Sequence, residues 1–240
     1  MKQDDTLKSR IYDALSAAGI DAAEDSCGKL AVYMDGVLEK NREINLTAIT
    51  DPDRFIIEHI VDSASLLRVP EYEAAETICD VGTGAGFPGI VLAALSEDKT
   101  ITMIDSLAKR LKVIDDLAGK AGIRNIKLVH ARAEDAGHDP ELRAKFDIVT
   151  ARAVAALPVL SELCIPLVKK GGAFIAYKTE NCGEEIKESG KAANILGVGK
   201  ITTQDAGVSG TEHVLVIMKK TDKTPGKYPR KAGDPARNPL

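Results

Sequence analysis

The chain has 240 residues, of which 44% are hydrophobic and 4% aromatic, and it contains no Trp. Its core must therefore be aliphatic, as in α/β proteins whose buried strands are rich in Val, Ile and Leu. The formal net charge of −4 argues against a protein that coats nucleic acid by its overall charge, although a local basic patch is compatible with it.

Residues 1–69 are predicted to form an N-terminal helical extension. Apolar residues recur at helical spacing in three stretches: Leu7–Leu15, Leu30–Leu38 and Phe55–Ser63. Asp51 followed by Pro52 is typical of the start of the third helix. The first residues are polar and lack the apolar run of a signal peptide, and no stretch reaches about 18 apolar residues. We therefore expect a cytoplasmic protein without a membrane span.

Residues 70–220 are predicted to form an α/β domain. Short apolar strands are expected at Thr77–Val81, Thr100–Asp105, Ile126–His130, Phe146–Ala151 and Gly172–Tyr177. Helices are expected between and after them, at Pro88–Ser96, Ala108–Ala121, Ala155–Val168 and Glu184–Leu196. This alternation indicates a doubly wound, mostly parallel sheet covered by helices on both faces. A short connection joins Ile201–Thr203 to the last apolar strand, His213–Met218, which we expect to pair antiparallel at the end of the sheet.

The segment TICDVGTGAGFPG places a glycine-rich turn between the first strand and a helix. Gly82, Gly84 and Gly86 let the backbone turn sharply and approach a ligand, and the helix points its free N–H groups at the same place. Nucleotide-like cofactors bind at this carboxyl edge of a parallel sheet. Asp80 favours S-adenosylmethionine, because a carboxylate can receive its ammonium group but would repel a pyrophosphate. Two alternatives are an NAD fingerprint in the register from Gly84 to Gly89, and a turn that needs glycine only for its shape.

The loops after the following strands supply further candidates at the same edge of the sheet. Asp105 can accept hydrogen bonds from both ribose hydroxyls or cap the following helix, and Ser106 is a second candidate for the ribose. Ala133 and Glu134 lie where a backbone N–H could read an adenine ring, or they form a solvated acidic loop. Arg152 ends an apolar strand, where it can hold a carboxylate or phosphate bidentately or be an ordinary surface residue.

Neither a hydrolase triad nor a metal site is expected. His59, Asp62 and Ser63 lie on one predicted helix face, but residues so spaced on one helix cannot assemble a triad, and no nucleophile elbow accompanies them. The cluster is either structural or faces the substrate. The four cysteines form no CxxC pair, which favours a reducing compartment.

Residues 221–240 are predicted to form a basic C-terminal tail. From residue 219 onward the chain has seven Lys or Arg against two Asp. Lys227, Arg230, Lys231 and Arg237 alternate with Pro and Gly, which suggests an ordered surface strip that grips phosphates. The alternative is a set of lysines that only increases solubility.

These features together resemble the bacterial 16S ribosomal RNA guanine-N7 methyltransferase family known as RsmG, formerly glucose-inhibited division protein B. The resemblance runs from about Asn41 to Leu240, in the segments NLT, HIVDS, DVGTGAGFPG, IDSLAKR, ARAED, TARAV and YPRKAGDPARNPL. It implies a class I S-adenosylmethionine-dependent methyltransferase fold with seven strands and an N-terminal helical extension. One departure is Glu58, where many relatives carry Arg.

The resemblance also implies site residues and a target. S-adenosylmethionine is expected to contact Gly82, Phe87, Ala133, Glu134 and Arg152, with Asp105 near the ribose. The implied target is a guanine in the decoding-region loop of small-subunit ribosomal RNA, offered as naked 16S rRNA or as the 30S subunit. We place His59 and the four basic tail residues on the RNA side, and we expect a monomer.

Guanine N7 carries a free lone pair at neutral pH, so the reaction requires no general base and we assign no catalytic residue. We expect direct in-line transfer of the sulfonium methyl, with catalysis resting on positioning and on exclusion of water. Because the purine becomes positively charged, Arg152 should pair with the cofactor or an acidic neighbour rather than face the ring. The alternative functions are an NAD-dependent oxidoreductase and a cofactor- or RNA-binding module without turnover.

Overall fold

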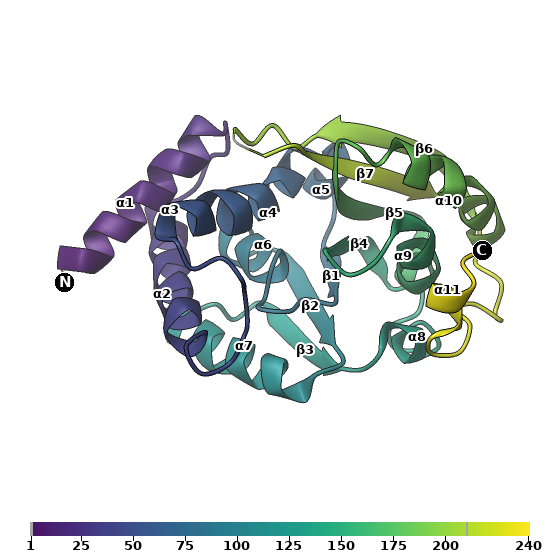
Figure 1. The fold of residues 1–240 in the computed structure, drawn as a ribbon, viewed down its shortest axis with the longest axis horizontal. Coiled ribbons are helices and arrows are strands. Elements are labelled where there is room, and N and C mark those ends of the chain that lie inside the picture. The colour runs from purple at the N-terminus through teal and green to yellow at the C-terminus, as the bar shows by residue number, and fades with distance from the viewer. Residues whose placement is uncertain (1, 210) are drawn as a thin grey trace.

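The computed structural model describes residues 2–209 and 211–240 (Figure 1). Met1 and Gly210, which fall in the predicted extension and in the connection before the last strand, lie outside the described residues. The N-terminal part runs α1 (Lys2–Ala17), α2 (Glu24–Lys40), α3 (Pro52–Phe55), the π-helical turn η1 (Ile56–Val61), α4 (Asp62–Ala64), the 3₁₀ turn η2 (Ser65–Arg68) and α5 (Pro70–Glu73). The rest runs β1 (Thr77–Val81), α6 (Gly89–Leu95), β2 (Thr100–Asp105), α7 (Ala108–Ala121), β3 (Ile126–His130), α8 (Ala133–Ala136), β4 (Phe146–Arg152), α9 (Leu157–Cys164), η3 (Ile165–Leu167), β5 (Val168–Thr179), α10 (Gly183–Leu196), β6 (Val198–Asp205), β7 (His213–Lys220) and α11 (Asp234–Arg237).

The seven strands form one sheet in the order β3-β2-β1-β4-β5-β7-β6. Strands β1 to β5 pair in parallel, whereas β7 pairs antiparallel with both β5 and β6. The predicted doubly wound, mostly parallel sheet and its antiparallel last strand are therefore confirmed. The strand order reverses between β1 and β4, and such a switch point is where parallel sheets bind ligands.

One predicted helix, Ala155–Val168, is wrong at both ends. Helix α9 starts at Leu157, with Pro158 in its first turn, and stops at Cys164. Pro166 has no N–H for a helical hydrogen bond, and the chain there forms the 3₁₀ turn η3. Strand β5 then begins at Val168, four residues before the predicted start.

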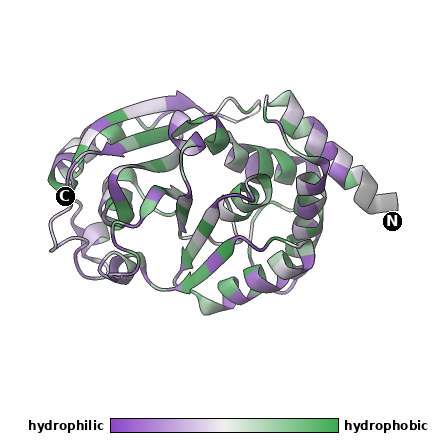
Figure 2. Cartoon of the chain, turned by 180° about the vertical axis from the view of Figure 1, so that it is seen from behind, coloured by the Kyte–Doolittle hydropathy of each residue, from purple (hydrophilic) through white to green (hydrophobic). Residues whose placement is uncertain are grey.

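The sheet has a hydrophobic layer on each face. Alternate residues of β1 illustrate this: Ile78 joins a cluster with α2, α6 and α7, whereas Cys79 joins one with α9 and α10. Figure 2 shows hydrophobic residues gathered in the strands and hydrophilic ones mostly on outer helices and loops. The aliphatic core expected from the composition is thus two layers around one sheet.

The N-terminal helices pack against the first of these layers. Helix α2 contacts α6 and α7, and α1 contacts η1. The predicted start at Asp51 is confirmed, because its side chain accepts a hydrogen bond from Arg54 N (2.9 Å) and Pro52 occupies the first turn. In Figure 1 the N-terminus and C-terminus lie at opposite ends of the long axis.

Candidate functional site

The glycine turn between β1 and α6 has a backbone that glycine favours. Gly82, Gly84 and Gly86 have φ of +75°, +60° and +98°. A Cβ on Gly86 would lie 2.4 Å from the Tyr33 hydroxyl oxygen of α2. That hydroxyl donates a hydrogen bond to Ala85 O (2.9 Å), so a helix of the N-terminal extension contacts and supports the glycine turn.

Asp80, at the end of β1, is fully buried beneath the turn. Its Oδ2 accepts hydrogen bonds from Thr83 Oγ1 (2.6 Å) and Gly89 N (3.0 Å). Its Oδ1 is buried and has no hydrogen-bond partner among the described residues. Burial raises the pKa of Asp80 to about 6 against the effect of those two hydrogen bonds. An unpaired buried carboxylate oxygen fits the ammonium group of a ligand, directly or through water.

Asp105, at the end of β2, binds the backbone on both sides. Its Oδ2 accepts from Gly84 N (3.0 Å) and its Oδ1 accepts from Leu107 N (2.9 Å), at the start of α7. The helix-capping role given as an alternative is not observed, because Leu107 precedes α7 and no side chain caps the first turn of that helix. Asp105 also ties β2 to the glycine turn, and Arg110 Nη1 lies 3.7 Å from Oδ2.

A cavity of about 330 Å³ lies at this edge of the sheet. Its lining includes Gly82, Asp105, Ser106, Ala133 and Glu134, five of the ten residues predicted to bind the cofactor. The carboxyl ends of β1, β2 and β3 bring these residues together. Their contact with a cofactor stays a prediction.

Phe87 points its ring away from this cavity, into the core. The ring stacks on His59, with centroids 4.8 Å apart and planes at 4°, and meets Phe55 edge-on. It is 6% exposed. The predicted Phe87 contact would therefore be made mainly by the backbone of the turn.

Arg152, at the end of β4, is paired with an acidic neighbour. Its Nη1 donates to Asp62 Oδ2 (2.9 Å) and to Glu58 O (2.7 Å), and its Nη2 donates to His59 Nδ1 (2.9 Å). Asp62 is fully buried, and its Oδ1 accepts from His213 Nδ1 (2.8 Å). The expected pairing with an acidic neighbour is present.

His59 is held as a neutral ring. Because Arg152 donates to Nδ1, the proton must lie on Nε2, which donates to Thr47 Oγ1 (2.7 Å). Burial, and next the charge of Arg152, lower the pKa of His59 to about 3. Ser63 Oγ donates to the His59 carbonyl oxygen rather than to its ring. His59, Asp62 and Ser63 therefore do not form the hydrogen-bond chain of a hydrolase triad in this structure.

A second cavity, of about 440 Å³, adjoins the first at Ala153. Its lining includes Glu58, His59, Arg152, Tyr177, Lys178, Glu185 and His213. Ala153 has a left-handed φ of +56°, which turns the chain between the two cavities. Both cavities therefore lie at the carboxyl end of β4.

Sequence reasoning missed Tyr177, Lys178, Glu185 and His213. A signal for His213 was available, because β7 was expected to run antiparallel at the end of the sheet. An antiparallel strand starts at the edge where parallel strands end, and His213 pairs with Thr179, the last residue of β5.

The predicted tail is an ordered segment that is hydrogen bonded to α8 and α9. Arg230 Nε donates to Glu162 Oε1 (2.8 Å), and Glu162 is fully buried in α9. Arg143 donates to four carbonyl oxygens, those of Gly137, Thr224, Pro225 and Tyr228. Gly233 N donates to Glu134 Oε1 (3.2 Å), which lines the first cavity.

The predicted RNA-side residues differ in their surroundings. The Arg230 guanidinium is committed to Glu162, whereas Lys227 lies over the Tyr228 ring at 5.2 Å and Arg237 pairs with Asp234 at 3.4 Å. His59 is not brought together with them, since the cavity that it lines includes none of these tail residues.

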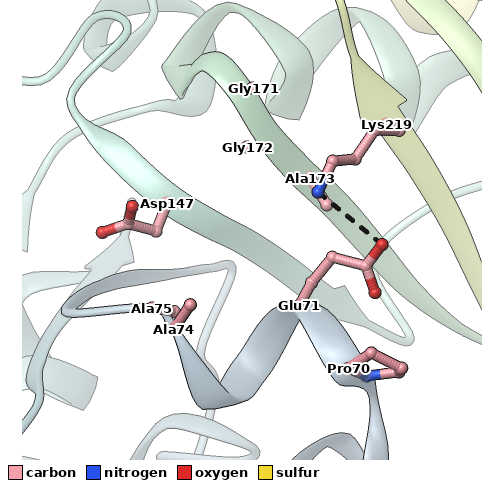
Figure 3. A pocket seen from close by; sticks show the side chains of 9 residues that line it. All are labelled: Pro70, Glu71, Ala74, Ala75, Asp147, Gly171, Gly172, Ala173 and Lys219. Carbon is pink, nitrogen blue, oxygen red and sulfur yellow. Dashed lines mark ion pairs between the residues drawn. The ribbon is translucent and has the colours of Figure 1, made fainter.

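A third cavity, of about 320 Å³, lies at the opposite, amino edge of the strands and contains no predicted site residue. Figure 3 shows Glu71 and Lys219 facing one another across it, 3.7 Å apart. Within residues 2–209 and 211–240, no cluster of three or more His, Cys, Asp or Glu could hold a metal ion. None of the helices described here is long and apolar enough to cross a bilayer.

Comparison with known proteins gives close sequence relatives. The sequence model of the family described as rRNA small subunit methyltransferase G matches residues 26–214. The chain is 43% identical to the ribosomal RNA small subunit methyltransferase G of Clostridium perfringens (strain 13), over 95% of this chain and 96% of that protein. It is 42% identical to the protein of the same name from Desulfitobacterium hafniense (strain Y51), over 92% of each.

Solved structures with low sequence identity share the fold. An O-methyltransferase from Bacillus cereus, solved in complex with SAH, superposes with a TM-score of 0.55 at 16% identity, over 78% of this chain and 90% of that one. The apo S-adenosylmethionine-dependent methyltransferase SibL gives a TM-score of 0.57 at 13% identity, over 89% of this chain and 77% of that one. The class I methyltransferase fold is therefore shown.

Proposed function

Because the chain belongs to the rRNA small subunit methyltransferase G family, we propose that it methylates N7 of a guanine in the decoding-region loop of 16S rRNA, using S-adenosylmethionine. One structural observation carries this assignment. The cavity beside the glycine turn and the second cavity meet at Ala153, so that a methyl donor and an acceptor base can be brought together.

The first cavity takes the cofactor. Asp80 Oδ1, which lacks a partner within the described chain, receives the ammonium group, and Gly82 and Gly84 allow close approach of the backbone. Asp105 and Ser106 face the ribose, and Ala133 and Glu134 face the adenine. Arg152 bounds the site through its bonds to Asp62 and His59 rather than by a free charge.

The second cavity takes the target guanine. Bound S-adenosylmethionine supplies an electrophilic methyl group, which is transferred in line to N7. Guanine N7 has a lone pair without losing a proton, so the chain's task is to orient the base and exclude water. His59 agrees with this role because it stays neutral and, with both nitrogens engaged, is no proton acceptor.

The RNA would lie along the ordered tail. Lys227, Lys231 and Arg237 offer cations to phosphates, and Arg230 supports the strip through Glu162. The target base must be unstacked to enter the cavity, which a single-stranded loop allows at low cost. We place the protein in the cytoplasm, acting as a monomer on 16S rRNA or the 30S subunit.

The test is methyl transfer to small ribosomal subunits. Subunits from cells that lack this activity are incubated with the protein and S-adenosylmethionine labelled in the methyl group, and the labelled nucleotide is mapped. We expect one labelled guanine, modified at N7. Tight cofactor binding without label on RNA would instead support a binding module, and label only on a small molecule would overturn the proposed substrate.

The NAD alternative is tested separately by calorimetry. Asp80, with an unpaired carboxylate oxygen under the turn, disfavours a pyrophosphate. We expect S-adenosylhomocysteine to bind and NAD to give no heat of binding under the same conditions. Binding of NAD alone would overturn the cofactor assignment.

A further inference from the structure

Most polar side chains around the second cavity are already engaged. Lys178 Nζ contacts Glu185 (2.7 Å) and donates to Ala155 O (3.0 Å), and the Tyr177 hydroxyl donates to Ser63 O (2.6 Å). The ring nitrogens of His59 are bound by Arg152 and Thr47. These groups shape the cavity, but they already form hydrogen bonds or ion pairs with other groups of the protein.

His213 differs from them because only one side of its ring is engaged. Its Nδ1 is bound to the buried carboxylate of Asp62, which fixes the orientation of the ring. No hydrogen bond to its Nε2 exists within the described part of the chain, and the side chain is 33% exposed. The ring lines the second cavity, so Nε2 is available to a base held there.

We propose that His213 determines the base specificity of the reaction by donating a hydrogen bond from Nε2 to the O6 carbonyl of the target guanine. This inference rests on the function proposed above. In guanine, O6 and N7 lie on the same edge and both accept hydrogen bonds, whereas adenine presents an amino donor in place of O6. A donor at O6 therefore selects guanine and leaves the N7 lone pair free for the methyl group.

The charges around His213 favour the doubly protonated ring that this role needs. The hydrogen bond to Asp62 raises its pKa, and Glu58 acts in the same direction, whereas burial and Arg152 oppose them. Lys178 and Glu185, from β5 and α10, lie at the same cavity as an ion pair. The buried Asp62 carboxylate contacts both the His213 ring and Arg152, so these two cations share one anion.

The first experiment compares pH profiles. Wild-type kcat/KM for methylation of unmodified 30S subunits should fall as the pH rises through the His213 pKa, because the Nε2 proton is lost. His213→Gln, whose amide is a donor at every pH, should lose this fall at high pH and should have kcat/KM lowered about ten- to hundredfold at neutral pH. His130→Gln, on β3 outside the second cavity, should keep the wild-type pH dependence.

The second experiment changes the base. Small subunits are reconstituted with 16S rRNA carrying inosine or 2-aminopurine at the methylated position. Inosine keeps O6 and N7, and should be methylated at a rate within about threefold of guanine, whereas 2-aminopurine lacks O6 and should lose at least about tenfold. His213→Ala should reduce this difference, and its affinity for S-adenosylhomocysteine should equal that of wild type.

Several results would overturn the inference. They are equal rates on inosine and 2-aminopurine, rejection of inosine, or a His213→Gln profile that still follows pH like wild type. Loss of discrimination in Lys178→Gln but not in the His213 variants would assign the contact to Lys178. If the wild type labels no native subunit at all, the proposed function itself fails, which separates that outcome from the others.

Discussion

Asp80 is a buried carboxylate whose ionisation should depend on what binds beside it. Both of its oxygens are buried, but only Oδ2 is hydrogen bonded among the described residues. Oδ1 is therefore the oxygen that can pair with a ligand. A pKa of about 6 means that a modest fall in pH protonates the group.

Cofactor binding is accordingly expected to weaken in acid. A ligand ammonium pairs with ionised Asp80, so below its pKa of about 6 a proton competes with the ligand. The dissociation constant of S-adenosylhomocysteine should rise about tenfold per pH unit well below that pKa. Calorimetry between about pH 5 and pH 8 measures this dependence. Asp80→Asn should bind weakly throughout and lose the dependence; if it keeps the wild-type profile, another group is responsible.

The glycines of the turn are expected to differ on substitution. A Cβ on Gly84 meets only Gly82 O, at 3.9 Å, so Gly84→Ala adds only the strain of a positive φ, about 1–2 kcal/mol. A Cβ on Gly86 would lie 2.4 Å from Tyr33 Oη and 2.8 Å from Ile90 Cγ1. Gly86→Ala should therefore lower the free energy of unfolding more than Gly84→Ala in urea titrations. Equal losses would mean that Tyr33 moves aside freely.

At the scale of single residues, the sequence predicted those site residues that belong to a short local motif. The glycines and Asp80 were recognisable because one strand and one turn contain the pattern, and Asp105 was recognisable because it ends the next strand. The contact between Asp62 and His213 joins residues 151 positions apart and depends on how β7 enters the sheet. No local pattern contains that information.

Strands were easier to predict from the sequence than irregular helices. The bounds of β1, β2 and β3 agree with the predicted ones because each is a short apolar run between turns. The turn η1 was predicted as ordinary helix, since a π-helical turn differs from an α-helix by one residue and leaves the apolar spacing nearly unchanged. This turn carries Glu58 and His59 to the second cavity.

Helix α2 is expected to contribute to cofactor affinity although it lines neither of the two cavities. Tyr33→Phe removes only the hydroxyl that donates to Ala85 O, which should cost about 1 kcal/mol in unfolding and weaken binding of S-adenosylhomocysteine. Thermal unfolding and calorimetry measure the two effects. Tyr12→Phe, on the exposed face of α1, is the control and should change neither. Unchanged affinity in Tyr33→Phe would show that the turn holds its shape unaided.

At the scale of the whole molecule, the C-terminal tail packs against the α/β domain and is bonded to it through side chains. Arg230 and Glu162 form a pair in which the carboxylate is 1% exposed. The predicted ordering of the tail agrees with this structure, but its attachment to α8 and α9 could not be predicted, because the acceptors lie in distant segments.

Breaking this pair is expected to destabilise the protein. Arg230→Leu leaves the buried Glu162 carboxylate without its cation and should lower the free energy of unfolding by about 3 kcal/mol, measured in urea. Arg230→Leu combined with Glu162→Gln should recover part of that loss. Arg237→Leu, whose partner Asp234 is exposed, should change stability by less than about 0.5 kcal/mol. A comparable loss in Arg237→Leu would refute a special role for the buried pair.

The walls of the second cavity come from both the predicted extension and the predicted α/β domain. His59 belongs to the first, and Arg152 and His213 belong to the second. Arg152 binds His59, and Asp62 of the extension, buried behind the wall, binds both Arg152 and His213. We therefore expect the segments on the two sides of residue 69 to unfold together. We expect a single calorimetric unfolding transition with equal calorimetric and van't Hoff enthalpies. Two resolved transitions would show that the helices melt independently of the sheet.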